Sequence, residues 1–408
     1  MIQILHNKML SSKAYMDIEA KYGAKNYKPI PVVIKRAKGV WVWDPEGKKY
    51  LDCLSAYSAV NQGHLHPKII KAVKKQMKSV TLTSRAFYND RLGSFLQKLC
   101  DVSGMEVALP MNTGAEAVET GIKIARRWGY RIKKVPVNQG EIITCNDNFH
   151  GRTTTIVGFS TDPGANEDFG PFTPGFVNIP FNNTNALEKA ITPNTIAFLV
   201  EPIQGEAGVI IPDAGYLKKV REICTKHNIL LITDEIQTGF CRTGKMFCFM
   251  HDDIKPDILL VGKALGGGVM PVSAALSSKA VMDVITPGSH GSTFGGNPLA
   301  CAVGEASLDV LIDEALAERS EKLGKYFLEG IKEINSPLFK EIRGKGLFIA
   351  IQLTDEAGKA RKYTEQLKEL GLLAKETHEH TIRLAPPLII KESEIDWALS
   401  ILKQVFIG

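Results

Sequence analysis

Short apolar runs alternate with amphipathic stretches through the middle of the chain. The runs that predict strands cover residues 141–145, 196–200, 229–233, 258–261 and 273–276. Between two of them, residues 216–227 form a helical pattern whose apolar stripe holds Leu217, Val220, Ile223 and Cys224. Apolar strands separated by helices are typical of a mostly parallel sheet covered on both faces. Because such sheets bind ligands beyond the carboxyl ends of their strands, we expect the chemistry there.

The two ends of the chain show a different pattern. Residues 32–44 alternate partly between apolar and polar positions, and a turn at 45–47 follows, so a hairpin is expected. After residue 297 come two long helical patterns, a β-rich stretch around 346–353 and helices near 361–370 and 392–405. These patterns predict an α/β fold: a large domain over residues 51–309, and a smaller α+β domain built from residues 1–50 and 310–408.

Length and charge change this picture little. A chain of 408 residues suits two domains. The net charge is +6, but the densest basic cluster has helical spacing between apolar residues, as on the solvated face of an amphipathic helix: Lys68, Lys71, Lys74, Lys75 and Lys78. We therefore expect no nucleic-acid partner, although a mild positive charge suits anionic small molecules.

The cysteines and the apolar runs bear on the compartment. The seven cysteines include no CxxC pair, which is typical of free thiols in a reducing compartment. No apolar run has the length that crosses a bilayer, so we expect no membrane partner. The cytoplasm is the predicted location, with an organelle matrix as the alternative.

Two strand ends carry candidate chemistry. Asp234 and Glu235 end a predicted buried strand, where a carboxylate needs donors or a cation. They could cap a helix or form a structural ion pair, or one of them could accept a hydrogen bond from a protonated heterocycle. Lys263 ends the next apolar strand, before three glycines. It could extend into solvent, or desolvation could lower its pKa, as an amine that forms a Schiff base requires.

Two further motifs favour an anionic, planar ligand. Residues 111–118 open a predicted helix, so Gly114 and Ala115 would offer backbone N–H groups to a phosphate or simply start a capped helix. Phe149 and Arg152 follow the strand at 141–145, where the ring could stack on a ligand and the guanidinium could bind a carboxylate. A core ring and a surface ion pair are the alternatives. We expect His150 to be a satisfied structural histidine.

In this order and context, the motifs resemble the class III aminotransferases of fold type I, which use pyridoxal 5'-phosphate (PLP). The pair Asp234 and Lys263 carries the resemblance together with the strings at 113–117, 149–152, 201–206, 234–237, 262–264 and 291–297. The resemblance extends from about Tyr22 to the C-terminus. It implies a large domain with a mostly parallel sheet and a smaller domain built from both termini.

The resemblance also implies how the cofactor is held. Lys263 would bond covalently to PLP and then carry the proton between substrate and cofactor carbons, while Asp234 would keep the ring nitrogen protonated. Gln237 would approach the ring hydroxyl, and Phe149 and Ile236 would cover the two ring faces.

The phosphate site implied by the resemblance involves two subunits. Gly114 and Ala115 would bind the phosphate from one subunit, and Ser292 and Thr293 would reach it from the other. The protein would then be a homodimer with its active sites at the interface.

Several strings are closer still to the ornithine branch of the family: residues 22–27, 55–63, 82–87, 343–346 and 382–387. That branch moves the δ-amino group of L-ornithine to 2-oxoglutarate, giving glutamate 5-semialdehyde and glutamate in a ping-pong reaction. His150 is a departure, because some ornithine enzymes have tryptophan there and Phe-His-Gly-Arg is usual in the acetylornithine branch.

The ornithine branch implies roles for five substrate residues. Tyr27 and Arg152 would hold the distal α-amine and carboxylate of ornithine, and Tyr57 would shape the pocket. Glu206 would neutralise Arg383 in the half-reaction with ornithine. In the half-reaction with glutamate the pair would open, and Arg383 would be free for the α-carboxylate. Without such masking, a free guanidinium would draw the wrong end of ornithine to the cofactor.

Other functions remain alternatives at this point. The nearest are aminotransferases for N-acetylornithine or 4-aminobutyrate, and a PLP mutase or decarboxylase could use the same fold. A non-catalytic binding module is disfavoured because Lys263 and Asp234 are both present. A nicotinamide dehydrogenase is disfavoured because no Gly-x-Gly-x-x-Gly lies between a strand and a helix. We expect no metal, since the only close histidine pairs, at 64/66 and 378/380, lack partner ligands at a recognisable spacing.

Overall fold

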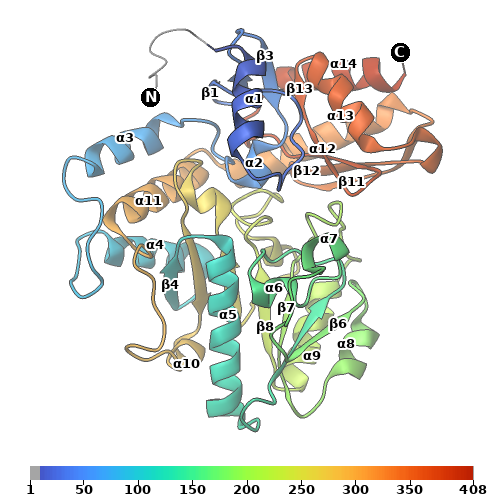
Figure 1. Cartoon of the computed structure of the whole chain (residues 1–408). Coiled ribbons are helices and arrows are strands. Elements are labelled where there is room, and N and C mark those ends of the chain that lie inside the picture. The colour runs from blue at the N-terminus through green and yellow to red at the C-terminus, as the bar shows by residue number, and fades with distance from the viewer. Residues whose placement is uncertain (1–9, 408) are drawn as a thin grey trace.

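The computed structural model describes residues 10–407 and is built around a seven-stranded sheet (Figure 1). The strand order is β4-β10-β9-β8-β7-β5-β6, and only β10 runs antiparallel to its neighbours. The strands are β4 (Val107–Met111), β5 (Glu141–Cys145), β6 (Phe176–Ile179), β7 (Thr195–Val200), β8 (Leu230–Asp234), β9 (Ile258–Val261) and β10 (Ser273–Ser277). The mostly parallel sheet is confirmed, and each of the five predicted strands matches to within one residue at either end.

Helices cover both faces of this sheet, as predicted, because alternate residues of the central strands point to opposite sides. Leu199 and Ile232 pack in the same core as Val118 of α5 (Gly114–Trp128), whereas Phe198 and Leu231 pack with α9 (Tyr216–Lys226). The remaining helices of this part are α3 (Pro67–Gln76), α4 (Leu92–Ser103), α6 (Thr154–Val157), α7 (Pro163–Asn166), α8 (Thr184–Ala190), α10 (Lys279–Met282) and α11 (Pro298–Asp313). The predicted amphipathic helix with the basic face is α3.

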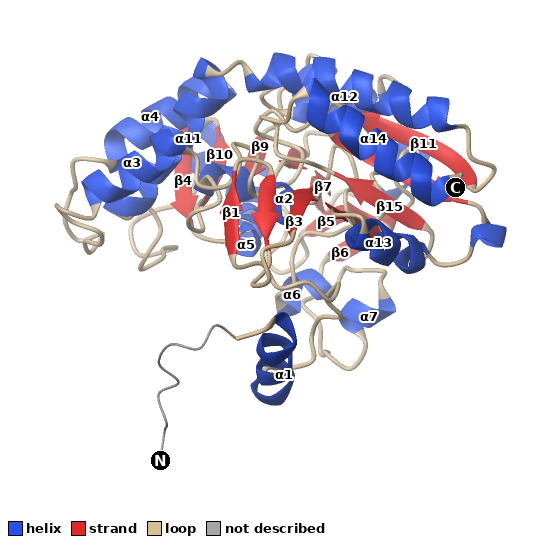
Figure 2. Ribbon diagram, turned by 90° about the horizontal axis from the view of Figure 1, so that it is seen from above, coloured by secondary structure: helices blue, strands red, loops and turns tan. Residues whose placement is uncertain are grey.

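The two ends of the chain come together above the large sheet (Figures 1 and 2). Strands β1 (Arg36–Lys38), β2 (Trp41–Trp43), β3 (Lys49–Asp52) and β13 (Leu372–Leu373) form one sheet, in which β3 and β13 are parallel. A second sheet has the order β11-β12-β15-β14, with β11 (Phe339–Lys345), β12 (Phe348–Leu353), β14 (Lys375–Thr377) and β15 (Thr381–Leu384). Three helices pack against these two small sheets or against one another: α12 (Leu316–Ile334), α13 (Ala360–Glu369) and α14 (Glu392–Phe406). Helix α1 (Ser12–Tyr22) precedes β1. The exact domain boundaries stay a prediction.

The predicted hairpin is confirmed at its turn but not along its length. Strands β2 and β3 pair across a turn at residues 44–48. Residues 32–44 are not one strand, however, because the chain reverses at Gly39, whose φ of +62° is readily adopted by glycine, and β1 then pairs back on β2.

Two further expectations concern the whole chain. All seven cysteines are unpaired thiols, as predicted. Within residues 10–407, no helix combines the length and the apolar character that a membrane span requires.

Candidate active site

An inner cavity of about 210 Å³ lies where the sheet topology predicted it. Asp234 ends β8, Lys263 follows β9 after one residue, and Gly114 opens α5. The lining also includes Ala115, Phe149, His150, Gly151, Glu201, Ile203, Ile236, Gln237 and Thr238. The fold therefore brings together the residues that the sequence assigned to the cofactor, apart from Ser292 and Thr293.

The Lys263 amine is the reactive group of this cavity. Burial lowers the pKa of the Lys263 ammonium from its usual value, against the opposing charges of Glu206 and Asp234. Its Nζ makes no hydrogen bond or ion pair with any residue of 10–407. Lys263 also has a φ of +44°, a left-handed conformation that is strained for a side-chain-bearing residue and is concentrated at functional sites. The chain thus holds an amine with a lowered pKa, which favours a nucleophile.

The structure separates the two carboxylates at the end of β8. Glu235 accepts hydrogen bonds from the Thr238 hydroxyl and from the backbone N–H groups of Cys248 and Phe249, so it is structural. Asp234 lines the cavity and accepts a hydrogen bond from the Ile236 N–H at 3.0 Å. The role of Asp234 toward a protonated heterocycle stays a prediction.

The prediction for His150 was wrong. Its Nδ1 lies 2.6 Å from the Oδ2 of Asp234, its side chain is 1% exposed, and its Nε2 has no partner among the described residues. Burial works against the charged imidazole, but the hydrogen bond to Asp234 raises the pKa of His150. His150 therefore positions Asp234. No local pattern indicates this contact, because the two residues are 84 positions apart along the chain.

Glu201 is a second residue that the sequence reasoning missed. It follows β7 directly, and its carboxylate accepts hydrogen bonds from the backbone N–H groups of Phe149 at 3.0 Å and Gly205 at 3.4 Å. Burial raises the pKa of Glu201 to about 7. The rule that pointed to Asp234, a carboxylate just after a buried strand, would have found Glu201 as well.

The start of α5 is a candidate anion site. Thr113 and Glu116 form a capping box, which satisfies the N–H groups on either side of the first turn. The N–H groups of Gly114 and Ala115 have no acceptor within residues 10–407. A side chain at Gly114 would place its Cβ 3.1 Å from Ile236, so glycine keeps that approach open. Together with the helix dipole, these free donors fit a phosphate.

The inner cavity as a whole fits a phosphorylated heteroaromatic aldehyde. Phe149 and Ile236 both line it and supply apolar surface for a flat ring, Asp234 supplies an anionic acceptor, and Lys263 supplies an amine. Gln237 lines it too, and its Nε2 lies 3.3 Å from Glu206 Oε1.

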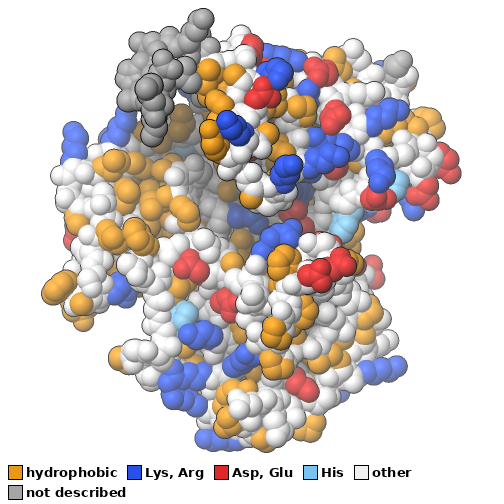
Figure 3. All heavy atoms as spheres, viewed as in Figure 1, with side chains coloured by type: hydrophobic (Ala, Val, Ile, Leu, Met, Phe, Trp, Pro, Cys, Tyr) orange, Lys and Arg blue, Asp and Glu red, His pale blue; other side chains and the backbone are white. Residues whose placement is uncertain are grey.

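An outer cavity of about 540 Å³ adjoins the inner one and shares Phe149, His150 and Gly151 with it. Figure 3 shows the molecule hollowed between its upper and lower parts, with charged side chains of both signs around the hollow. Four predicted substrate residues line the outer cavity: Tyr27, Tyr57, Arg152 and Glu206. The Arg152 guanidinium is exposed and lies 5.5 Å from the centre of the Phe149 ring.

The fifth predicted substrate residue, Arg383, is buried behind Glu206. Its Nη1 donates to Glu206 Oε1 at 2.7 Å and to the Gly205 carbonyl at 3.3 Å, and its guanidinium lies 5.2 Å from the centre of the Tyr57 ring. Its side chain is 1% exposed, and its Nε and Nη2 have no partner among residues 10–407. Burial opposes ionisation of Glu206, but the charge of Arg383 lowers the pKa of this carboxyl. The pair is therefore ionised, with part of the guanidinium still unsatisfied.

Tyr57 is presented by an unusual backbone segment. The turn labelled α2 (Ser55–Ser58) has positive φ at all four residues, between 45° and 71°, so it is a left-handed turn. Such a turn costs about 1–2 kcal/mol per residue. Contacts from elsewhere hold it: the Ser55 hydroxyl donates to the Ala385 carbonyl at 2.6 Å, and the buried Arg242 donates to the same hydroxyl at 3.1 Å. The direction of the Tyr57 ring is thus set by tertiary contacts.

Ser292 and Thr293 do not reach the inner cavity of their own chain. They line a separate cavity of about 560 Å³ with Leu82 and Arg85. Ser292 Oγ accepts hydrogen bonds from Asn112 Nδ2 at 2.8 Å and from the Gly295 N–H at 3.0 Å, whereas Thr293 is exposed. A role for them at a phosphate therefore requires a second subunit and stays a prediction.

The chain is similar to known proteins over nearly its whole length. Residues 22–406 match the family "Aminotransferase class-III". The ornithine aminotransferase of Brevibacillus brevis is 60% identical over 97% of this chain and 99% of its own length. The solved ornithine aminotransferase of Toxoplasma gondii, with PLP partly occupying its active site, superposes with a TM-score of 0.97 at 45% identity, covering 98% of this chain and 95% of that one. The acetylornithine aminotransferase of Elizabethkingia anophelis has a TM-score of 0.89 at 49% identity, covering 98% and 99% of the two chains.

Proposed function

The chain belongs to the class III aminotransferases, and we propose that it transfers the δ-amino group of L-ornithine to 2-oxoglutarate with PLP as cofactor. The products are glutamate 5-semialdehyde and glutamate. The observation that carries this proposal is the ion pair between Glu206, which lines the outer cavity, and the buried Arg383. Both charges act on Lys263: Glu206 raises the pKa of its ammonium and Arg383 lowers it.

PLP supplies an electron sink that stabilises negative charge on the substrate carbon bonded to the reacting nitrogen. Its phosphate would bind the N–H groups of Gly114 and Ala115, and its ring would lie against Phe149 and Ile236. Asp234 would keep the ring nitrogen protonated, and the contact with His150 fixes the direction of that carboxylate. Gln237 would lie near the ring hydroxyl.

Lys263 would serve as both the attachment point and the proton carrier. Its lowered pKa leaves a larger fraction of neutral amine near neutral pH, and a neutral amine can attack an aldehyde or accept a proton. No other base is needed for the proton at the reacting carbon.

The charge arrangement favours ornithine over α-amino substrates in the first half-reaction. Because Glu206 neutralises Arg383, the inner end of the site offers no free cation to the α-carboxylate of ornithine. That carboxylate would bind Arg152 at the outer end, with the α-amine near Tyr27, so the δ-amine points inward. When the second substrate is 2-oxoglutarate, Glu206 would move aside, leaving Arg383 for the α-carboxylate and Arg152 for the γ-carboxylate.

N-acetylornithine is the second candidate donor, favoured by His150 within Phe-His-Gly-Arg and by the likeness to an acetylornithine aminotransferase. An acetyl group would remove the positive charge and add bulk where the α-amine meets Tyr27. A substrate panel decides between them. We expect ornithine to give the cyclic imine that forms from glutamate 5-semialdehyde, identified by trapping and mass analysis. Higher catalytic efficiency with N-acetylornithine or 4-aminobutyrate than with ornithine would overturn the proposed substrate. It would not contradict the use of PLP as cofactor.

We also propose that the active form is a homodimer in which Ser292 and Thr293 of one subunit approach the phosphate of the other. Large apolar side chains exposed near these residues support an interface there: Leu82, Phe87, Tyr88 and Phe294. A location in the cytoplasm is part of the same proposal, supported by the seven free thiols. A fully active monomer in sedimentation experiments would contradict the dimer.

A further inference from the structure

The segment that carries Tyr27 is an arm, residues 24–31, between α1 and β1. It contains no helix or strand, and Tyr27 is 73% exposed although it lines the outer cavity. Within residues 10–407, apart from a local hydrogen bond from the Val32 N–H to the Ile30 carbonyl, the only hydrogen bonds that join this arm to the rest of the chain come from Arg361 of α13. The position of Tyr27 over the cavity therefore depends on one side chain outside the site.

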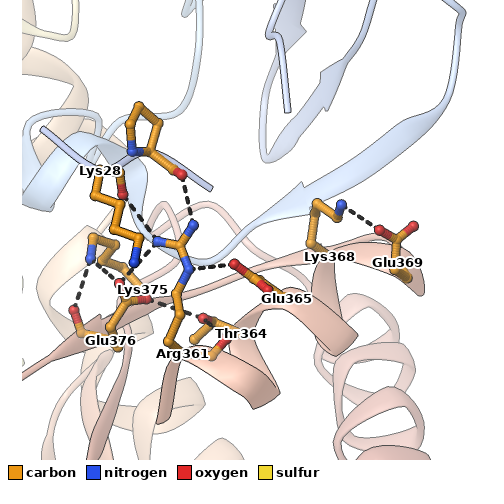
Figure 4. A network of polar contacts seen from close by, with 9 residues as sticks. Lys28, Arg361, Thr364, Glu365, Lys368, Glu369, Lys375 and Glu376 are labelled. Atoms are coloured by element: carbon orange, nitrogen blue, oxygen red, sulfur yellow. Dashed lines mark hydrogen bonds and ion pairs between the residues drawn. The ribbon is translucent and has the colours of Figure 1, made fainter. Parts of the chain in front are cut away.

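Arg361 binds the arm through both terminal nitrogens of its guanidinium. Nη1 donates to the Lys28 carbonyl at 3.0 Å, and Nη2 donates to the Pro29 carbonyl at 2.7 Å. Figure 4 shows the guanidinium between these carbonyl groups and two carboxylates. Only the planar fork of arginine can bind two consecutive carbonyls in this way, since a lysine ammonium is a single point of charge.

Two carboxylates fix the guanidinium from the other side. Glu365 Oε1 accepts from Nε at 2.6 Å, and Glu376 Oε1 accepts from Nη1 at 3.1 Å. Glu376 also accepts hydrogen bonds from Lys375 Nζ at 2.6 Å and from the Thr364 hydroxyl at 3.1 Å. The Arg361 side chain is only 19% exposed, so these contacts are partly shielded from water.

The network also borders the substrate. Glu376 and Lys375 belong to β14, and both line the outer cavity together with Tyr27. Arg361 therefore links the arm to Lys375 and Glu376, which line the part of the outer cavity that the distal end of a substrate would contact. It touches neither cavity itself, and it lies apart from the pair of Glu206 and Arg383.

We propose that Arg361 is a positioning residue for the amine donor: it holds Tyr27 over the outer cavity and thereby sets the preference for a donor with a free α-amine. This inference rests on the proposed function. Glutamate lacks a distal amine and would bind through Arg152 and Arg383, neither of which makes a hydrogen bond or a ring contact with residues 24–31. Loss of Arg361 should therefore weaken the ornithine half-reaction selectively.

The test compares Arg361→Gln and Arg361→Lys with Lys368→Gln in the PLP-loaded enzyme. Lys368 lies on the same helix and pairs with Glu369, away from the arm, so its replacement is a matched loss of charge (Figure 4). Single-turnover half-reactions with ornithine and with glutamate give the apparent Kd and the maximal rate for each donor. Hydrogen exchange of residues 24–31 reports the arm directly, and Tyr27→Ala and the double variant Arg361→Gln/Tyr27→Ala complete a mutant cycle.

For Arg361→Gln we expect an apparent Kd for ornithine raised roughly tenfold, an almost unchanged maximal rate, glutamate values within about twofold, and faster exchange in the arm. Arg361→Lys should show a smaller change in the same direction, and Lys368→Gln none. Tyr27→Ala should cost as much as Arg361→Gln, with no further loss in the double variant.

Unchanged ornithine binding in Arg361→Gln, equal losses for both donors, or additive losses in the double variant would each overturn the inference. If Arg361→Gln does not fold, Arg361→Lys decides by the same criteria. A wild-type enzyme that does not use ornithine refutes the proposed function instead, and the exchange of residues 24–31 then still decides whether Arg361 holds the arm.

Discussion

Replacing Glu206 by glutamine should shift the preference of the enzyme from ornithine towards donors with an α-carboxylate beside the reacting amine. Glutamine has almost the same shape and keeps an oxygen that can accept from Arg383, but it removes the negative charge that masks the guanidinium. Arg383 would then present its cation, with Nε and Nη2 already lacking partners among residues 10–407, to the α-carboxylate of glutamate.

The size of this shift follows from the geometry. The Nη1 to Oε1 distance is 2.7 Å and the Arg383 side chain is 1% exposed, but the Glu206 side chain is 30% exposed, so solvent weakens the pair. A hydrogen bond to a charged group contributes about 1.5–3 kcal/mol, and the lower end applies because glutamine keeps a neutral hydrogen bond. A change of about 1.4 kcal/mol is tenfold in an equilibrium constant. We therefore expect the ratio of glutamate to ornithine efficiency to rise roughly tenfold.

The assay is stopped-flow absorbance of the bound cofactor in single half-reactions, with glutamate and with ornithine as separate donors. Glu379→Gln is the control, because Glu379 pairs with the exposed Lys359 on the surface. A Glu206→Gln enzyme that folds, binds PLP and keeps the wild-type ratio would refute the masking of Arg383, even if both rates fell together.

Three further predictions concern the cofactor, the proposed second subunit and pH. Lys263→Ala should lower turnover by roughly 10³-fold or more, and borohydride followed by peptide mapping of the wild type should label Lys263; a label on another lysine contradicts this. Thr293→Ala should release PLP faster on dialysis while leaving the thermal midpoint nearly unchanged; a large loss of midpoint would instead indicate a structural role. Burial raises the pKa of Glu201 from its usual 4.5 to about 7, so the folded protein retains a proton that the unfolded chain releases. The unfolding free energy should therefore decrease as pH rises from about 4.5 to 7, and urea titrations of Glu201→Gln should lack this part of the slope.

The large sheet could be predicted from the sequence because its signal is local. Strand 258–261 is apolar over its whole length and strand 141–145 over most of it, since a parallel sheet with helices on both faces buries both sides of each strand. The rule that ligands bind beyond the carboxyl ends of these strands then placed Asp234 and Lys263 at one site without any structure. The same rule applied to Glu201 would have added a third residue.

Which contacts these residues make was decided only by the tertiary structure. Nothing near His150 in sequence indicates its contact with Asp234, and nothing near residues 24–31 indicates Arg361. The left-handed turn at Ser55–Ser58 has no glycine to signal it, because distant groups at Arg242 and Ala385 hold it. Local patterns determine which elements form, through the burial of their apolar faces. The direction and protonation of each site residue depend instead on partners that are brought close only when the chain has folded.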